Sequence, residues 1–259
     1  MKSRIHKTAM VSSKAKIGEN VNIEAYAIIQ DDVEIGNNCS IGPHAVIYDG
    51  ARIGNNVVIH QASSIANAPQ DLKYAGEKTF LYIGDNTTVR EYATLNRGTD
   101  ATGFSKVGAN CLLMAYTHIG HDCVVGDNCI LANAVTLGGH VELGEFVIIG
   151  GMTPVHQFSK VGKHAMVGGG FRIIKDIPPY IVAGSEPLRF SGLNLIGLRR
   201  RGFTDEDISI LKNSYKVIYN SGLNFSQAIE KLRGIYPEHQ LVKNIVDFIS
   251  NSSRGIIRR

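Results

Sequence analysis

Histidine is the residue type in this sequence best suited to chemistry, and nine histidines occur among its 259 residues. Four of them, His118, His121, His140 and His156, fall within a stretch of about 40 residues in the middle of the chain. A neutral imidazole ordinarily titrates near pH 6.5 and can take a proton from a hydroxyl group, which typically accelerates a reaction about 10²- to 10⁴-fold. These histidines predict acid–base chemistry, provided that the fold brings them together.

The elements that would position them are indicated by a repeat of six residues. Aliphatic residues recur at every sixth position through most of residues 11–173, from Val11 to Ile173. A small or β-branched residue usually stands four positions later, with Asn, Asp and Gly between. Helices repeat every three and four residues and simple strands every two, so neither fits alone. The repeat predicts a short strand with two inward side chains, followed by a tight corner.

Three such strands per coil predict a parallel β-helix shaped as a triangular prism, a mainly β fold. Its left-handed sense is taken from resemblance to known hexapeptide prisms, because most parallel crossovers are right-handed. Residues 71–82 and 101–106 lack the repeat. They are predicted to be loops extruded from the prism, where functional residues tend to gather.

Winding by 18 residues per coil would bring the histidines to one edge of the prism. Gly139 then falls above His121, and Gln157 falls above Gly139. At ordinary strand spacing, three coils span about 10 Å. The residues predicted to share this edge are His118, His121, Gly139, His140, His156 and Gln157.

This edge suits acyl transfer to an alcohol. His121 would act as the general base, and the unobstructed backbone N–H of Gly139 would stabilise a developing oxyanion. Asp122 could orient His121, although neighbouring residues on a strand point to opposite sides. Zinc binding is the competing use of the same imidazoles.

Bulk properties exclude several classes of protein. A net charge of +4 is too small for a nucleic-acid-binding footprint. No 18-residue apolar run and no secretory signal are visible, so we expect a cytoplasmic protein without an integral membrane segment. The four cysteines all occupy the small inward position, which indicates core packing; they are Cys39, Cys111, Cys123 and Cys129.

The repeat breaks at Pro178-Pro179, and the periodicity becomes helical beyond about Phe190. Thr204, followed by three acidic residues, predicts a helix N-cap, and further helices are expected over residues 226–236 and 238–252. We therefore predict a β-helical domain over residues 1–189 and a small helical domain over residues 190–259. The helical domain would cover an otherwise exposed strand edge.

The motifs closely resemble those of the UDP-N-acetylglucosamine acyltransferases that begin lipid A synthesis, over nearly the whole chain. The resemblance is carried by the runs QDLKYAGE at residues 70–77, HIGHDC at residues 118–123, GGMTPVHQF at residues 150–158 and RRGF at residues 200–203. It implies a homotrimer with active sites between subunits. It also implies transfer of an (R)-3-hydroxyacyl chain from acyl carrier protein to the glucosamine 3-hydroxyl of UDP-N-acetylglucosamine (UDP-GlcNAc).

The resemblance also implies roles for individual residues. His121 matches the general base, Gly139 the backbone donor, and Asp71 the loop carboxylate that contacts the sugar. The residues that match substrate-binding positions are Gln70, Lys73, His118, His140, His156, Gln157, Gly169, Asn194, Arg200 and Arg201. No metal and no bound cofactor are implied, because the phosphopantetheine arrives on the donor protein.

Three positions bear on specificity. Gly169 matches the position that limits acyl length, and a glycine there predicts a chain of about 14 to 16 carbons in an open groove. Ile196 stands where the family often has a glutamate near the nucleotide, and Pro187 stands where a histidine often closes the acyl groove. The sequence leaves open whether the acceptor is the ordinary sugar or its 3-amino analogue.

Three other readings remain. The N-acyltransferase of the same pathway shares the prism but has an additional N-terminal domain, for which the start of the repeat at Val11 leaves no room. A zinc-dependent carbonic anhydrase shares the prism, but its histidine spacing differs. A non-catalytic or ice-binding prism would carry regular threonine ladders, and it leaves the histidine edge unexplained.

Overall fold

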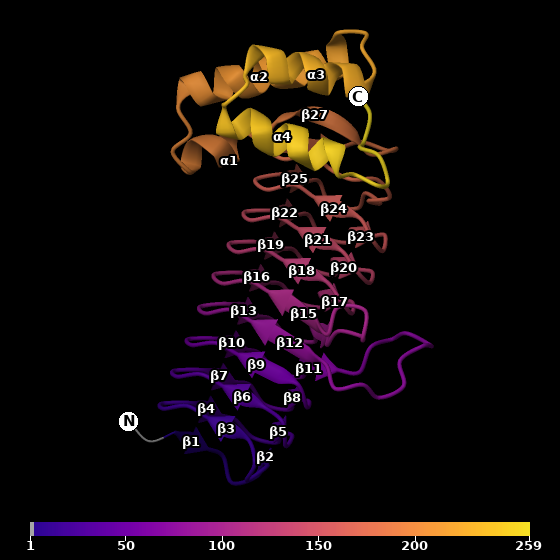
Figure 1. The fold of residues 1–259 in the computed structure, drawn as a ribbon. Helices are drawn as coiled ribbons and strands as arrows, with labels where there is room; N and C mark the ends of the chain where they lie inside the picture. The colour runs from indigo at the N-terminus through magenta and orange to yellow at the C-terminus, as the bar shows by residue number, and fades with distance from the viewer. Residues whose placement is uncertain (1–2) are drawn as a thin grey trace.

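The computed structural model describes residues 3–259 and shows a parallel β-helix with helices at its C-terminal end (Figure 1). Sheet A contains, in order, β1(Arg4–Ile5), β4(Asn22–Ile23), β7(Ser40–Ile41), β10(Val58–Ile59), β13(Thr88–Val89), β16(Leu112–Leu113), β19(Ile130–Leu131), β22(Ile148–Ile149), β25(Met166–Val167), β26(Ile181–Gly184) and β27(Arg189–Leu193). Sheet B contains β2(Met10–Val11), β5(Ile28–Ile29), β8(Val46–Ile47), β11(Ser64–Asn67), β14(Thr94–Asn96), β17(His118–Ile119), β20(Thr136–Leu137) and β23(Pro154–Val155). Sheet C contains β3(Lys16–Ile17), β6(Glu34–Ile35), β9(Ala51–Ile53), β12(Phe80–Ile83), β15(Phe104–Val107), β18(Val124–Val125), β21(Glu142–Leu143) and β24(Lys160–Val161).

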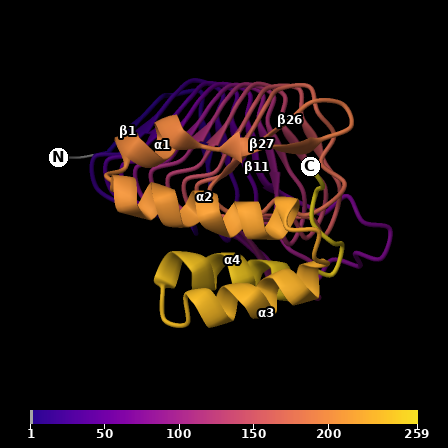
Figure 2. The ribbon, with the colours of Figure 1, turned by 90° about the horizontal axis from the view of Figure 1, so that it is seen from above.

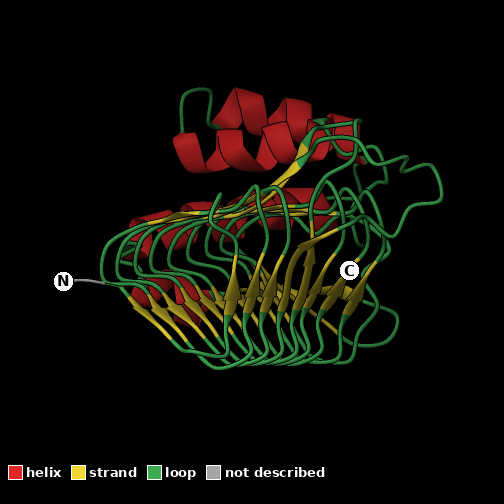
Figure 3. Cartoon of the chain, turned by 90° about the horizontal axis from the view of Figure 1, so that it is seen from below, coloured by secondary structure: helices red, strands yellow, loops and turns green. Residues whose placement is uncertain are grey.

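The predicted winding is confirmed by the strand register. His118 pairs with Thr136, and Thr136 pairs with Pro154, so each coil outside the loops advances the chain by 18 residues. The repeated aliphatic side chains fill the axis, and residues such as Ile41, Ile119 and Leu137 are fully buried. Seen from below, the strands stack into faces joined by corners (Figure 3).

The corners explain why Asn recurs in the repeat. The backbone of Asn20, Asn38 and Asn56 has φ of 56°, 58° and 56°, a left-handed conformation that Asn tolerates better than most residues. Their side chains also bond across coils: Asn20 Nδ2 donates to Asn38 Oδ1 at 3.0 Å, and Asn56 Nδ2 donates to Asn86 Oδ1 at 3.0 Å. The asparagine thus adopts the left-handed backbone conformation that the corner requires, and its side chain links neighbouring coils by hydrogen bonds.

The two interruptions are loops, but their predicted boundaries were wrong. Residues 80–82 and 104–106, predicted as loop, belong to β12 and β15, and these strands pair along their length. Leu81 and Ser105 are fully buried because they take the inward position that small residues usually fill. The loops therefore cover residues 68–79 and 97–103, and both leave the prism between sheets B and C.

The C-terminal part contains α1(Leu195–Arg200), α2(Asp205–Asn220), α3(Phe225–Ile235) and α4(Gln240–Ser250), which lie across the end of the prism (Figures 1 and 2). The predicted N-cap Thr204 is confirmed, with a capping box to Asp207. The last two predicted helices are confirmed with shifted ends, whereas α1 was not predicted and the expected helical onset near Phe190 is wrong, because β27 extends sheet A to Leu193. None of the helices within residues 3–259 has the length and apolar character needed to span a membrane.

Candidate active site

The predicted histidine edge is the edge between sheets B and C. His121 lies on the corner between β17 and β18, and His140 lies on the corner between β20 and β21. His156 and Gln157 lie on the corner between β23 and β24, and Gly139 directly precedes His140. Both extruded loops leave the prism at this edge, in the coils below His121.

The rings of this edge are packed against one another. The His121 and His140 ring centroids are 5.2 Å apart with an edge-to-face geometry, and His140 stacks on Phe158 at 4.5 Å. His118, in β17 of sheet B, shares a 2.8 Å hydrogen bond between Nδ1 and Thr94 Oγ1. Burial, and to a lesser degree the charge of His121, lowers the pKa of His118, so His118 is neutral near pH 7.

Asp122 orients His121 directly. Asp122 has φ of 59°, so the two residues are not on a regular strand, and their side chains do not diverge. His121 Nδ1 lies 2.7 Å from Asp122 Oδ2. The concern that neighbouring residues point apart was therefore wrong, because it assumed strand geometry at a corner.

The Asp122 carboxylate is held by the loop of residues 97–103. Its oxygens accept from Thr99 N at 2.9 Å, from Thr99 Oγ1 at 2.7 Å and from Thr102 Oγ1. Burial would raise the pKa of Asp122, but the hydrogen bonds from Thr102, His121 and Thr99 outweigh it and hold the pKa below its usual value. Asp122 is thus an anion with no exposed side-chain surface.

An ionised Asp122 fixes the tautomer of His121. A carboxylate accepts hydrogen bonds, so the proton of the neutral imidazole sits on Nδ1 and the lone pair on Nε2. The His121 side chain retains 15% of its exposure. Nε2 is therefore the atom that can take a proton from a bound molecule.

Gly139 lies against the His121 ring. A Cβ built on Gly139 would lie 2.6 Å from both Cε1 and Nε2 of His121, so only glycine leaves the ring undisturbed. Within residues 3–259, the Gly139 N–H donates none of the hydrogen bonds found, whereas Gly138 N donates to Val155 O and His140 N to His121 O. The arrangement can pair a base with a free backbone donor.

The predicted sugar-binding residues Gln70, Asp71 and Lys73 lie on the first extruded loop. Asp71 Oδ1 accepts from Lys73 N at 2.9 Å, and the side chains of Gln70 and Lys73 are exposed. None of the hydrogen bonds or ion pairs found in the described part of the chain joins Gln70, Asp71 or Lys73 to the histidines. The loop projects away from the prism (Figure 1).

Four further residues lie away from the histidine edge, Gly169 at another corner of the prism and the other three in or next to α1. Gly169 follows β25 at the corner between sheets A and B, and a Cβ there would meet Gly151 O at 3.0 Å. Asn194 caps α1, and its amide donates to His164 O at 2.9 Å. Arg200 is exposed, whereas the Arg201 guanidinium lies 5.0 Å from the Phe146 ring centroid. One chain therefore does not bring these residues to His121.

Thr99 and Thr102 were absent from the predicted site residues, and Asp122 was named only as a possible partner that orients His121. Asp122 was available as the neighbour of His121, but the two threonines belong to a loop outside the repeat, so counting by 18 could not place them. The sequence pattern carries no signal that pairs them with Asp122.

Comparisons with known proteins agree with one family. The profile described as "Udp N-acetylglucosamine O-acyltransferase; Domain 2" matches residues 176–257, and the bacterial transferase hexapeptide profile matches residues 14–49, 32–67 and 104–139. An acyl-[acyl-carrier-protein]–UDP-N-acetylglucosamine O-acyltransferase from Thiobacillus denitrificans is 46% identical over 98% of this chain and 99% of its own. The enzyme of the same name from Chlorobaculum parvum is 54% identical over 98% of this chain and 96% of its own.

Solved structures agree as well. The UDP-N-acetylglucosamine acyltransferase of Bacteroides fragilis superposes with a TM-score of 0.96 at 46% identity, covering 98% of this chain and 100% of that one. The enzyme of Francisella novicida superposes with a TM-score of 0.96 at 39% identity, covering 98% and 94%. The predicted fold class, a left-handed parallel β-helix, is thereby confirmed. This chain belongs to the acyl-[acyl-carrier-protein]–UDP-N-acetylglucosamine O-acyltransferase family.

Proposed function

We propose that this protein transfers an (R)-3-hydroxyacyl chain from acyl carrier protein to the glucosamine 3-hydroxyl of UDP-GlcNAc, the first step of lipid A synthesis. The observation that carries the chemistry is the His121–Asp122 pair, joined at 2.7 Å, with Nε2 free and the Gly139 N–H one coil away. Family membership supports the choice of donor and acceptor.

The reaction proceeds by direct attack. His121 Nε2 takes the proton from the 3-hydroxyl as its oxygen attacks the thioester carbonyl carbon, and the Gly139 N–H donates to the tetrahedral oxyanion. Asp122 stabilises the imidazolium formed at His121. The carbon–sulfur bond then breaks, and His121 returns the proton to the departing pantetheine thiol. No acyl-enzyme forms, and the phosphopantetheine enters and leaves on the carrier protein.

The remaining predicted contacts require more than one subunit. Asp71, Gln70 and Lys73 on the first loop would bind the sugar, with His118, His140, His156 and Gln157 lining the edge. Asn194, Arg200 and Arg201 would lie toward the nucleotide or the pantetheine, and Gly169 along the acyl chain. We propose a homotrimer, because neighbouring prisms would bring edges that are separate in one chain into a shared cleft.

Two positions at which this sequence differs from the family pattern, Ile196 and Pro187, affect the proposed substrate contacts. Ile196 is 69% exposed on α1, so no acidic group meets the nucleotide from that position. Gly169 and Pro187 leave the acyl groove open for a long chain, about 14 to 16 carbons. Strong preference for short donors in a chain-length assay would contradict this assignment.

One assay tests the function itself. The purified protein is incubated with UDP-GlcNAc and a panel of acyl-carrier thioesters, and the product is identified by mass. We expect a single 3-O-acylated sugar nucleotide from a long 3-hydroxyacyl donor. Absence of any acylated sugar nucleotide across the panel would reject the proposal.

One observation favours a second candidate, a metal site. Donor atoms of His121, Asp122 and His140 lie within 4.8 Å of one another. Zinc binds such nitrogen and carboxylate ligands. A zinc-dependent carbonic anhydrase built on the same prism would need a metal site of this kind. Metal analysis decides between the two: about one zinc per chain, with activity lost on chelation and restored by zinc, would favour the metal site.

A further inference from the structure

Arg97, at the root of the second loop, ties the first loop to the prism. Its Nη2 and Nε donate to the Tyr74 hydroxyl at 2.7 and 3.2 Å, and its Nη1 donates to Asp49 O and Ala66 O at 2.9 and 3.1 Å. The guanidinium also lies 5.6 Å from the Tyr74 ring centroid. All three nitrogens are therefore engaged, and they join three separate segments.

Tyr74 lies in the turn that carries the proposed sugar-binding carboxylate. Its N–H donates to Asp71 O at 3.1 Å, and its hydroxyl donates to Glu77 O at 3.0 Å. The Tyr74 hydroxyl thus bridges Arg97 to Glu77, and the Tyr74 backbone N–H ties the same residue to Asp71. A shift of the Tyr74 backbone would move Asp71, because the two residues are hydrogen-bonded within one turn.

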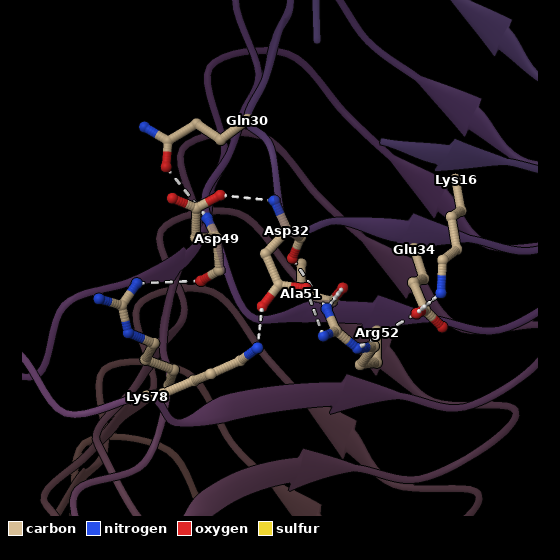
Figure 4. A network of polar contacts seen from close by, with 9 residues as sticks. Lys16, Gln30, Asp32, Glu34, Asp49, Ala51, Arg52 and Lys78 are labelled. Carbon is tan, nitrogen blue, oxygen red and sulfur yellow. Dashed lines mark hydrogen bonds and ion pairs between the residues drawn. The ribbon is translucent and has the colours of Figure 1, made fainter. Parts of the chain in front are cut away.

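The other ties of the loop are weaker or lie at its ends. Asn96 Nδ2 donates to Ala68 O at 2.8 Å, where the loop begins. Lys78 Nζ lies 3.4 Å from Asp32 Oδ2, where the loop ends, and Figure 4 shows this contact beside Arg52 and Asp49. The Lys78 side chain is 75% exposed, so this ion pair adds little rigidity. Arg97 is left as the anchor of the loop's middle.

We propose that Arg97 is a positioning residue that holds the loop of residues 68–79 in the conformation that binds the sugar nucleotide. The inference rests on the proposed function, which places Gln70, Asp71 and Lys73 at the sugar. A lysine cannot replace Arg97, because its single ammonium cannot reach the hydroxyl and both carbonyls in a fixed planar geometry.

The test compares Arg97→Lys and Tyr74→Phe with wild-type protein in the acyl-transfer assay. We expect the KM for UDP-GlcNAc to rise about tenfold, because both variants remove hydrogen bonds that hold the loop, with the KM for the acyl donor changed less than about twofold. Trypsin cleavage after Lys73 or Lys78 should also become faster, because the loop opens more often. Arg90→Lys is the matched control, since the Arg90 side chain pairs with its neighbour Glu91 on a different corner.

Two results would overturn the inference. Unchanged kinetics and cleavage in both variants would show that the loop needs no anchor, and equal losses for both substrates with a lower Tm would show a purely structural role. Should Arg97→Lys fail to fold, Tyr74→Phe decides alone, because it removes only a hydroxyl. Wild-type turnover is measured first, so that failure of the proposed function itself is seen separately.

Discussion

At the scale of single residues, the site depends on a backbone conformation. The positive φ of Asp122 turns its carboxylate to the side of His121, and the same corner position is occupied by His140 and Phe158 one and two coils above. The rings and the carboxylate therefore stack along one edge. This geometry makes His121 a base with a fixed tautomer and an open Nε2.

Gly139→Ala tests how closely the backbone approaches the base. The new Cβ would lie 2.6 Å from Nε2 of a ring that Asp122 holds in place, so the imidazole must move. We expect kcat to fall about 10²-fold, comparable to loss of one oxyanion donor or a base, with little change in Tm. Gly234→Ala, where a Cβ meets nothing within 4 Å, is the control. Wild-type kcat in Gly139→Ala would contradict the packing described here.

At the scale of elements, the second loop supports the catalytic carboxylate. Thr102→Val removes one hydrogen bond to buried Asp122, which should cost about 1.5–3 kcal/mol in the free energy of unfolding and raise the pKa of the carboxyl. We also expect kcat to fall, because Asp122 is held less firmly against His121. Acid unfolding should begin at a higher pH than in the wild type. Chemical denaturation and kcat measure both effects. Thr136→Val, at the exposed position of β20, is the control, and equal behaviour of the two variants would contradict the role of Thr102.

A second element, the ring stack between prism and helices, predicts a pH effect on stability. His164 stacks between Phe146 at 4.9 Å and Tyr180 at 5.6 Å. Burial, with the charges of Arg201 and Lys163, lowers the pKa of His164 from 6.5 to about 4. Between pH 6.5 and 4, His164 is protonated in the unfolded chain and neutral in the folded protein. The free energy of unfolding therefore falls by up to about 3 kcal/mol toward pH 4.

His164→Phe keeps the stack and removes the titration. Its free energy of unfolding should therefore vary less between pH 6.5 and 4 than that of the wild type, as measured by denaturant titration at each pH. His44→Phe, which makes the same exchange in the exposed stack with Tyr26, is the control. An unchanged profile in His164→Phe would mean that His164 charges freely in the folded protein.

The repeat explains which parts of the fold and site were predictable. The coil length followed from the six-residue period, and it placed His121, Gly139 and His156 on one edge without coordinates. The contacts of Thr99, Thr102 and Arg97 were not predictable, because they arise in loops that break the period. The same limit misplaced the loop ends, since Leu81 is a large residue in an inward position that small residues usually fill, and the polar Ser105 gave no sign of a buried strand.

At the scale of the whole molecule, the proposed trimer makes a prediction about shared sites. Among residues 3–259 no hydrogen bond or ion pair found joins Asp71 to His121, and the loop projects from the prism (Figure 1). Mixed trimers of Asp71→Ala and His121→Ala should therefore recover activity, since random assembly leaves about a quarter of the sites with both wild-type residues. Light scattering should give about three times the 28.1 kDa chain mass. No recovery in mixed trimers would place both residues in one subunit's site.

The most direct measurement is the turnover of His121→Ala beside its affinity for UDP-GlcNAc. We expect kcat to fall by about 10²- to 10⁴-fold or more, while calorimetry gives a dissociation constant close to that of the wild type. Catalysis that survived nearly intact, with the sugar nucleotide bound normally, would contradict the assignment of His121 as the base.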